Sequence, residues 1–204
     1  MLVLRVCNRY VSQVRDALYE ATVAVLAEVG WDGLTLERVA ERAKRSRVTL
    51  WRNGITRESL LEALLMRLAQ GYRDAMVPVL ASRGSVRERL ERTMYALCDV
   101  VDAHAEVLAV SDEMFHRAAE ISDIPMGFLD PFLRVIADAR AAGELRGGIK
   151  DVDLADILFN GTAWPYLHFR VRHHWPAARA KRLLVTALLN GVLQPSAPGG
   201  SSKG

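Results

Sequence analysis

Apolar side chains recur every three or four residues along most of this chain, the spacing that places them on one face of an α-helix. They form one such stripe from Val14 to Val29, and Gly30 follows where the left-handed residue that ends a helix is expected. No segment alternates apolar and polar residues for long enough to indicate a β-sheet. The pattern therefore predicts an all-α protein of about nine helices.

Two short helices follow the first one, with only about two residues between them. Thr35 is placed to cap the first of the pair. Ser46 is placed to cap the second, which runs from Arg47 to about Asn53 with Leu50 facing inward. Helices joined so tightly must cross, which is the arrangement of a helix-turn-helix.

Longer helices are expected in the rest of the chain. Thr56 is placed to cap a helix of about 57–77, which Pro78 should end because proline cannot continue the hydrogen-bond ladder. Ser85 and Glu88 have the spacing of a capping box and begin the next helix.

The remaining helices are predicted at about 106–120, 125–142, 151–172 and 176–193. Pro131 and Pro165 fall inside two of these ranges, and each is expected to start a new segment or to kink its helix.

The chain has 204 residues, half of them hydrophobic and a quarter charged, so it can bury a substantial core. Cys7 and Cys98 have neither disulfide-framework nor zinc-site spacing, which favours a reducing cytoplasm. Arginines interrupt the apolar N-terminus, and no later apolar run is long enough to cross a bilayer. We therefore expect neither an export signal nor a membrane partner. Residues 195–204 have the composition of a disordered tail.

Residues that could support catalysis or bind a metal are scattered along the chain. Ser-His-Asp, GxSxG, P-loop and HExxH patterns are absent from the sequence. His173 and His174 are adjacent and have no third ligand four residues away. We expect no catalytic residue, no metal site and no cofactor, and a small helical enzyme is the weakest of the alternatives.

Positive charge is concentrated in the helix-turn-helix segment. Residues 38–57 carry seven Arg or Lys residues and a single acid, Glu41, whereas the charges of residues 61–204 balance. A solvated helical face is the ordinary meaning of such a run. Its position in a helix-turn-helix favours DNA instead, because the major groove admits one α-helix.

Side-chain chemistry in residues 46–53 fits that groove. Arg47 and Arg52 can each donate paired hydrogen bonds to guanine, and Asn53 can pair with adenine. Ser46 and Thr49 are short enough to reach phosphates.

The residues from Ala21 to Leu61 resemble the N-terminal domain of the TetR family of transcriptional regulators. The resemblance rests on Gly30, Leu34-Thr35-Leu36, Val39-Ala40, Ala43, Ser46, Thr49-Leu50-Trp51, Glu58 and Leu60-Leu61, in that order. It implies a DNA-binding domain over residues 1–58, which a helix of about 57–77 connects to a ligand-binding and dimerisation domain over residues 59–194.

The resemblance also implies which residues contact DNA. Phosphate contacts fall at Thr35, Thr49, Trp51 and Arg57, and base contacts at Arg47, Val48, Arg52 and Asn53. Trp51 stands where the family usually has tyrosine. It either donates its indole N–H to a phosphate or fills the small core of the domain.

The chain departs from the family pattern near the two short helices. Lys44-Arg45 replaces the usual Gly-Val turn, so we expect Lys44 to adopt the left-handed conformation and Arg45 to reach the surface near the DNA backbone. Gly54 replaces an aromatic residue, whose packing Ile55 is expected to take over. These departures keep open an alternative, an all-α small-molecule sensor or protein-interaction dimer whose degenerate helix-turn-helix no longer reads DNA.

Met and aromatic side chains on the helices after residue 85 are typical of a core. The resemblance implies instead that these helices enclose a small hydrophobic effector, which polar groups would orient. The candidates for these ligand-binding groups are Tyr95, Asp112, Glu113, His116 and Trp164.

The last two helices are either buried within a monomer or paired with their copies as a four-helix bundle, and the resemblance favours the homodimer. The sequence as a whole predicts a cytoplasmic regulator that binds an inverted-repeat, double-stranded DNA operator and is released by its effector, acting as a repressor.

Overall fold

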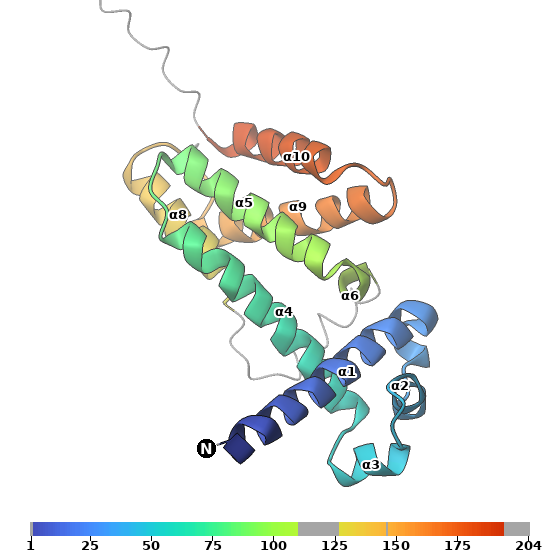
Figure 1. The fold of residues 1–204 in the computed structure, drawn as a ribbon. Coiled ribbons are helices and arrows are strands. Elements are labelled where there is room, and N and C mark those ends of the chain that lie inside the picture. The colour runs from blue at the N-terminus through green and yellow to red at the C-terminus, as the bar shows by residue number, and fades with distance from the viewer. Residues whose placement is uncertain (1, 110–126, 146, 194–204) are drawn as a thin grey trace, which may run out of the picture. The chain divides into compact units, whose positions relative to one another are not determined.

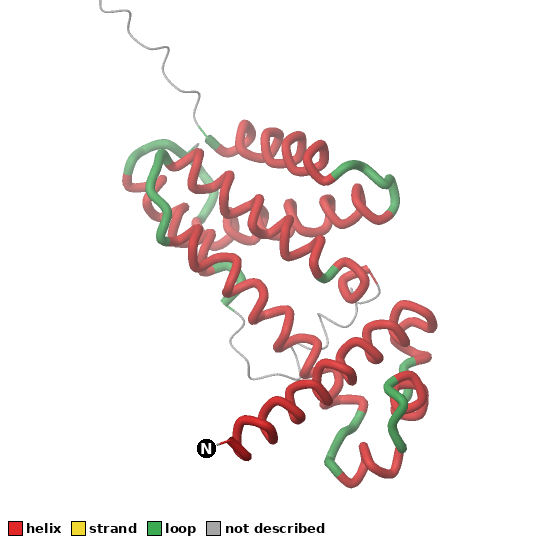
Figure 2. Tube along the Cα trace, in the orientation of Figure 1, coloured by secondary structure: helices red, strands yellow, loops and turns green. Residues whose placement is uncertain are grey.

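The computed structural model describes residues 2–109, 127–145 and 147–193, with side chains from residue 16 onward. Every named element in these ranges is an α-helix, nine in all, and the only β-pairing there is an isolated bridge between Leu145 and Leu193 (Figure 2). The predicted all-α fold is confirmed. None of the described helices is both long and apolar enough to span a bilayer.

The chain divides into two compact units, Met1–Gln70 with His104–Pro125, and Gly71–Ala103 with Met126–Gly204. The first unit contains α1 (Leu2–Gly33), α2 (Leu36–Arg42), α3 (Arg47–Arg52), the beginning of α4 (Arg57–Leu80) and α6 (Ala105–Ala109). The second contains the end of α4, α5 (Val86–Ala103), α8 (Asp130–Ala141), α9 (Asp151–Val171) and α10 (Ala177–Val192) (Figure 1).

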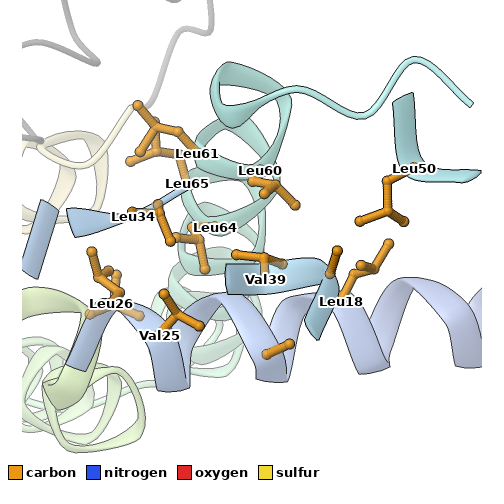
Figure 3. Packing of buried hydrophobic residues seen from close by; sticks show 13 residues of the cluster. Leu18, Val25, Leu26, Leu34, Val39, Leu50, Leu60, Leu61, Leu64 and Leu65 are labelled. Carbon is orange, nitrogen blue, oxygen red and sulfur yellow. The ribbon is translucent and has the colours of Figure 1, made fainter. Parts of the chain in front are cut away.

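One apolar cluster holds the first unit together. It combines the inward stripes of α1, α2 and α4 with Val107 of α6. The short helix α3 contributes a single buried residue, Leu50, whose side chain points toward Leu18 and Val39 (Figure 3). Because one leucine is its whole contribution to the core, most of the α3 surface is left for other contacts.

Three of the four predicted capping side chains are confirmed, and the fourth, Ser46, forms no capping hydrogen bond at the start of α3. The Thr35 hydroxyl accepts a hydrogen bond from the Arg38 amide at 3.3 Å. Thr56 and Ser59 cap the start of α4 reciprocally, each amide donating to the other hydroxyl. Ser85 and Glu88 form the expected capping box.

Helix ends agree less closely with the sequence. The chain leaves helical geometry at Gly30, with φ 68°, and residues 31–33 then add a helical turn. Pro78 does not end α4, which continues to Leu80 because Ala81 still donates its amide to the Val77 carbonyl at 3.2 Å. Helix α8 begins at Asp130 rather than near 125, with Pro131 in its first turn, where the missing amide costs nothing. Helix α9 runs through Pro165 as one helix, so no new segment starts there.

Methionine and aromatic residues are part of the core of the second unit, as their spacing indicates. Met94, Phe132 and Tyr166 are fully buried among α5, α8 and α9. Around Phe159, three aromatic rings pack with centroids 5.8–6.1 Å away: Tyr72, Phe128 and Phe132. The Tyr72 hydroxyl donates to the Phe128 carbonyl at 2.6 Å, which ties the loop before α8 to α4.

Cys98 lies in this core, and burial raises the pKa of its thiol to about 12. At pH 8 the thiol is therefore protonated and unreactive in the native state, whereas an unfolded chain exposes an ordinary cysteine. In a Cys7→Ser variant we expect a thiol reagent to label Cys98 only as fast as the protein unfolds, so that the rate rises with urea. Rapid, complete labelling of the native protein would contradict this burial.

Candidate nucleic-acid interface

Helix α3 presents nearly all of its side chains to solvent. Leu50 is 3% exposed, but Val48 and Trp51 are 61% and 71% exposed. The interpretation of Trp51 as a core residue is therefore wrong for this structure. An exposed tryptophan and valine contribute nothing to the core, and a surface that carries them beside arginines suits a partner with both apolar and anionic groups.

The unusual turn between α2 and α3 keeps the geometry that glycine would give it. Lys44 has φ 53°, and its amide donates to the Glu41 carbonyl at 3.0 Å. The next amide, of Arg45, donates to the Ala40 carbonyl at 2.8 Å. This pair of bonds is a Schellman motif, and the Arg45 side chain is exposed. The left-handed conformation of Lys44 and the surface position of Arg45 are thus confirmed, and the contact of Arg45 with DNA stays a prediction.

The end of α3 repeats the motif with glycine. Gly54 has φ 71°, its amide donates to the Trp51 carbonyl at 2.9 Å, and the Ile55 amide donates to the Leu50 carbonyl at 3.0 Å. Ile55 packs against the core cluster, which confirms its expected role. Lys44-Arg45 and Gly54 motivated the alternative of a degenerate helix-turn-helix, yet both turns have the hydrogen bonds of a regular helix end.

These two turns predict opposite effects on stability. Lys44→Gly should raise the free energy of unfolding by about 0.5–1 kcal/mol because a side chain in the left-handed region is strained. Gly54→Ala should lower the free energy of unfolding by about 1 kcal/mol, because alanine is strained in the left-handed region. No atom lies within 4 Å of the added methyl group, so a steric clash adds nothing to this cost. Urea denaturation of both variants measures the difference. A loss of stability in Lys44→Gly would mean that the lysine side chain stabilises the turn by other contacts.

The cations of residues 38–57 fall into two groups. Some stabilise the domain itself: Arg42 donates to both carboxylate oxygens of Glu28 on α1 at 2.5 Å, and Arg38 donates to the Gly33 carbonyl at 2.8 Å. Lys44, Arg45 and Arg52 are exposed and form no ion pair within the part of the chain described here. The second group is the positive charge available to a partner.

Arg57 belongs to the first group. Its Nη2 donates to the Trp31 carbonyl at 2.6 Å, and its guanidinium carbon lies 4.2 Å from the centroid of the Trp31 ring. Its Nε is buried and has no hydrogen-bond acceptor among the described residues. The phosphate contact expected of Arg57 stays a prediction, and an Arg57→Ala variant would test folding together with DNA binding.

The polar side chains in and beside α3 differ in the contacts that they already make within the domain. The Ser46 side chain forms no capping bond, and Thr49 is exposed. Asn53 stands at the C-cap and donates its amide to the Thr49 carbonyl at 2.9 Å, so it must rotate to pair with a base. Arg47 lies with its Nε 2.7 Å from a carboxylate oxygen of Glu37 on α2.

Comparison with known proteins finds similar sequences and folds among transcriptional regulators. No family model matches the chain. An uncharacterised HTH-type transcriptional regulator of Mycobacterium tuberculosis is 29% identical over 180 residues, which cover 88% of this chain and 85% of that protein.

Two solved structures share the fold. A TetR-family transcriptional regulator from Rhodococcus sp., described as putative, has a TM-score of 0.66 and 23% identity, covering 86% of this chain and 97% of that one. FadR from Bacillus subtilis, in complex with stearoyl-CoA, has a TM-score of 0.70 and 14% identity, covering 86% and 97%. The fold of the chain is therefore that of TetR-family structures.

The two effector-binding candidates that the structure describes, Tyr95 and Trp164, do not line one cavity. Asp112, Glu113 and His116 lie outside the described residues. Tyr95 on α5 lines an open cavity of about 680 Å³ with the first turns of α10, where Arg179, Lys181 and Arg182 also lie. Trp164 is not among the lining residues, and its indole donates to Asn160 on the same helix at 3.2 Å.

Two histidines near the end of α9 make a contact that their spacing did not predict. His173 lies past the end of α9, and its Nε2 is 3.0 Å from that of His168, five residues earlier. No group of three metal-ligating side chains occurs among the described residues. The turn that follows is held by Arg170, which is paired with Asp102 and donates to the Trp175 carbonyl.

Sequence reasoning did not single out Glu37 or Glu28 as partners of the basic segment. Each pairs with an arginine of another helix, and these pairs form only once α1, α2 and α3 are packed together. The one available signal was the position of Glu37 in the first turn of a short helix, ten residues before Arg47.

Proposed function

We propose that this chain is a homodimeric repressor that reads an inverted-repeat DNA operator with α3 and is released from it by a small hydrophobic effector. The observation that carries the proposal is the surface of α3, on which Leu50 alone is buried while its arginines, threonine and tryptophan face solvent. A helix held by one core residue can enter the major groove without disturbing the domain.

The exposed residues divide by chemistry into two sets. Arg47, Val48, Arg52 and Asn53 would contact base edges, and Thr35, Ser46, Thr49 and Trp51 would contact phosphates. Lys44 and Arg45 flank α3 and add positive charge toward the DNA backbone. In this proposal, base contacts set the sequence preference, and phosphate contacts set the register.

Dimerisation is proposed through α9 and α10. These helices pack together, and each carries a large apolar residue on its outer side: Ile157 is 50% exposed and Leu183 is 42% exposed. Their neighbours Leu154 and Leu158 are buried within the monomer. A two-fold axis through this face would give a four-helix bundle and an operator with two equivalent half-sites.

The effector proposal rests on the fold shared with FadR, which was solved in complex with stearoyl-CoA. A ligand that binds among the helices of the second unit would favour a conformation whose two recognition helices no longer match successive grooves. Linkage then requires the operator to weaken effector binding by the same factor. The protein would act in the cytoplasm, together with the DNA it reads.

A gel-shift titration with the DNA upstream of the protein's own gene tests the proposal. We expect retardation that weakens steeply as salt rises, because phosphate contacts release counterions. Selection from random oligonucleotides should then return an inverted repeat. Absence of retardation at low salt, with no sequence selected, would overturn the proposed function.

A further inference from the structure

Glu37 and Arg47 form the ion pair that connects the two helices of the helix-turn-helix. Oε1 of Glu37, in the first turn of α2, lies 2.7 Å from Nε of Arg47, the first residue of α3. Both side chains are more than half exposed. The pair therefore lies on the surface proposed above to face DNA.

The nitrogen that Glu37 approaches matters for what Arg47 can still do. Nε is at the inner end of the guanidinium group, and Nη1 and Nη2 are at its outer end. The outer end presents two parallel N–H groups, the arrangement that pairs with O6 and N7 of guanine. A carboxylate at Nε thus restrains the side chain and leaves Nη1 and Nη2 for a base.

We propose that Glu37 is a positioning residue for base recognition, which orients Arg47 toward a guanine of the operator. This inference rests on the proposed function of α3. An ion pair this exposed contributes little to folding stability, because water screens the charges and ordering two long side chains costs entropy. Its effect is on recognition, where a side chain ordered before binding loses less freedom when it meets the base.

The charge of Glu37 gives the proposal a distinctive signature. A carboxylate close to the DNA backbone repels phosphates, so it reduces affinity for every sequence alike. Removing it should raise non-specific affinity while lowering the preference for the correct base. A residue with only a structural role would move both quantities in the same direction.

Glu41 is the matched control. It lies one helical turn after Glu37 on α2, carries the same charge and is also exposed. Glu41→Ala should raise non-specific affinity in the same way and leave base preference unchanged. Glu37→Gln keeps an oxygen that can face Nε and should retain part of the preference.

The experiment begins with a site selected from random oligonucleotides by the wild-type chain. Fluorescence anisotropy then compares that site with single base-pair variants for Glu37→Ala, Glu37→Gln, Glu41→Ala, Arg47→Ala and the Glu37→Ala/Arg47→Ala double variant. We expect Glu37→Ala to lower the preference at one guanine position by about three- to tenfold. In the Arg47→Ala background the same change should have no further effect on that preference.

Two results would overturn the inference alone: an unchanged base preference in Glu37→Ala, or an equal loss of preference in Glu41→Ala. Selection of no sequence by the wild-type chain would instead overturn the proposed function, and the inference with it. Thermal denaturation of each variant verifies that the comparison is made between folded proteins.

Discussion

Trp51→Ala is expected to weaken operator binding by about a hundredfold while leaving the chain as stable as the wild type. The indole is 71% exposed, so its removal leaves no cavity. A hydrogen bond to a charged phosphate contributes about 1.5 kcal/mol, roughly tenfold in affinity, and a dimer loses two of them. Anisotropy titration with the selected operator measures the affinity, and urea denaturation measures the stability.

The neighbouring residue provides the control for this experiment. Leu50→Ala removes the only side chain by which α3 enters the core and should lower the free energy of unfolding by about 2–5 kcal/mol. Trp51→Phe keeps an aromatic ring without the N–H donor and should bind between the alanine variant and the wild type. A Trp51→Ala variant that binds like the wild type would contradict the proposed phosphate contact, and one that unfolds early would contradict a purely surface role for Trp51.

Placing charge on the outer face of α9 and α10 is expected to separate the dimer. Ile157→Glu and Leu183→Glu together would bury four carboxylates in the proposed bundle, a cost that an interface built on apolar packing cannot offset. Both side chains are exposed in the monomer, so its own core is unaffected. Sedimentation velocity should show a monomer, and operator affinity should fall by more than about a hundredfold as the two half-sites become independent.

Val77→Glu is the matched control for the dimer experiment. Val77 on α4 is another large apolar residue exposed on the described surface. This substitution should change neither the sedimentation coefficient nor the operator affinity. A double variant of α9 and α10 that still sediments as a dimer would exclude this face as the interface.

Helix starts were predictable from the sequence because they depend on a few neighbouring side chains. Thr35, Thr56 and Ser85 cap their helices as expected, since a hydroxyl and an amide three residues away meet without help from the rest of the fold. Helix ends were less predictable. Whether a proline ends a helix depends on what the following residues gain by continuing it, and α4 and α9 both extend past theirs.

The candidate site was predictable in its location and not in its contacts. The run of arginines and the spacing of Leu50 placed an exposed helix at residues 46–53. The sequence did not distinguish Arg42 and Arg57, which stabilise the domain, from Arg45 and Arg52, which are free to meet a partner. All four carry the same side chain, so only their neighbours in space separate them.

By itself, the sequence determined the all-α class, the helix-turn-helix and most of the capped helix starts, because these follow from periodicity and from local capping. The tertiary structure alone decided that Trp51 faces solvent, that Arg57 packs on the Trp31 ring, and that Glu37 approaches Arg47. Each of these depends on how far apart two helices lie and at what angle they cross. The linear sequence pattern does not give these distances and angles, because they are set when the apolar stripes of all the helices are buried together.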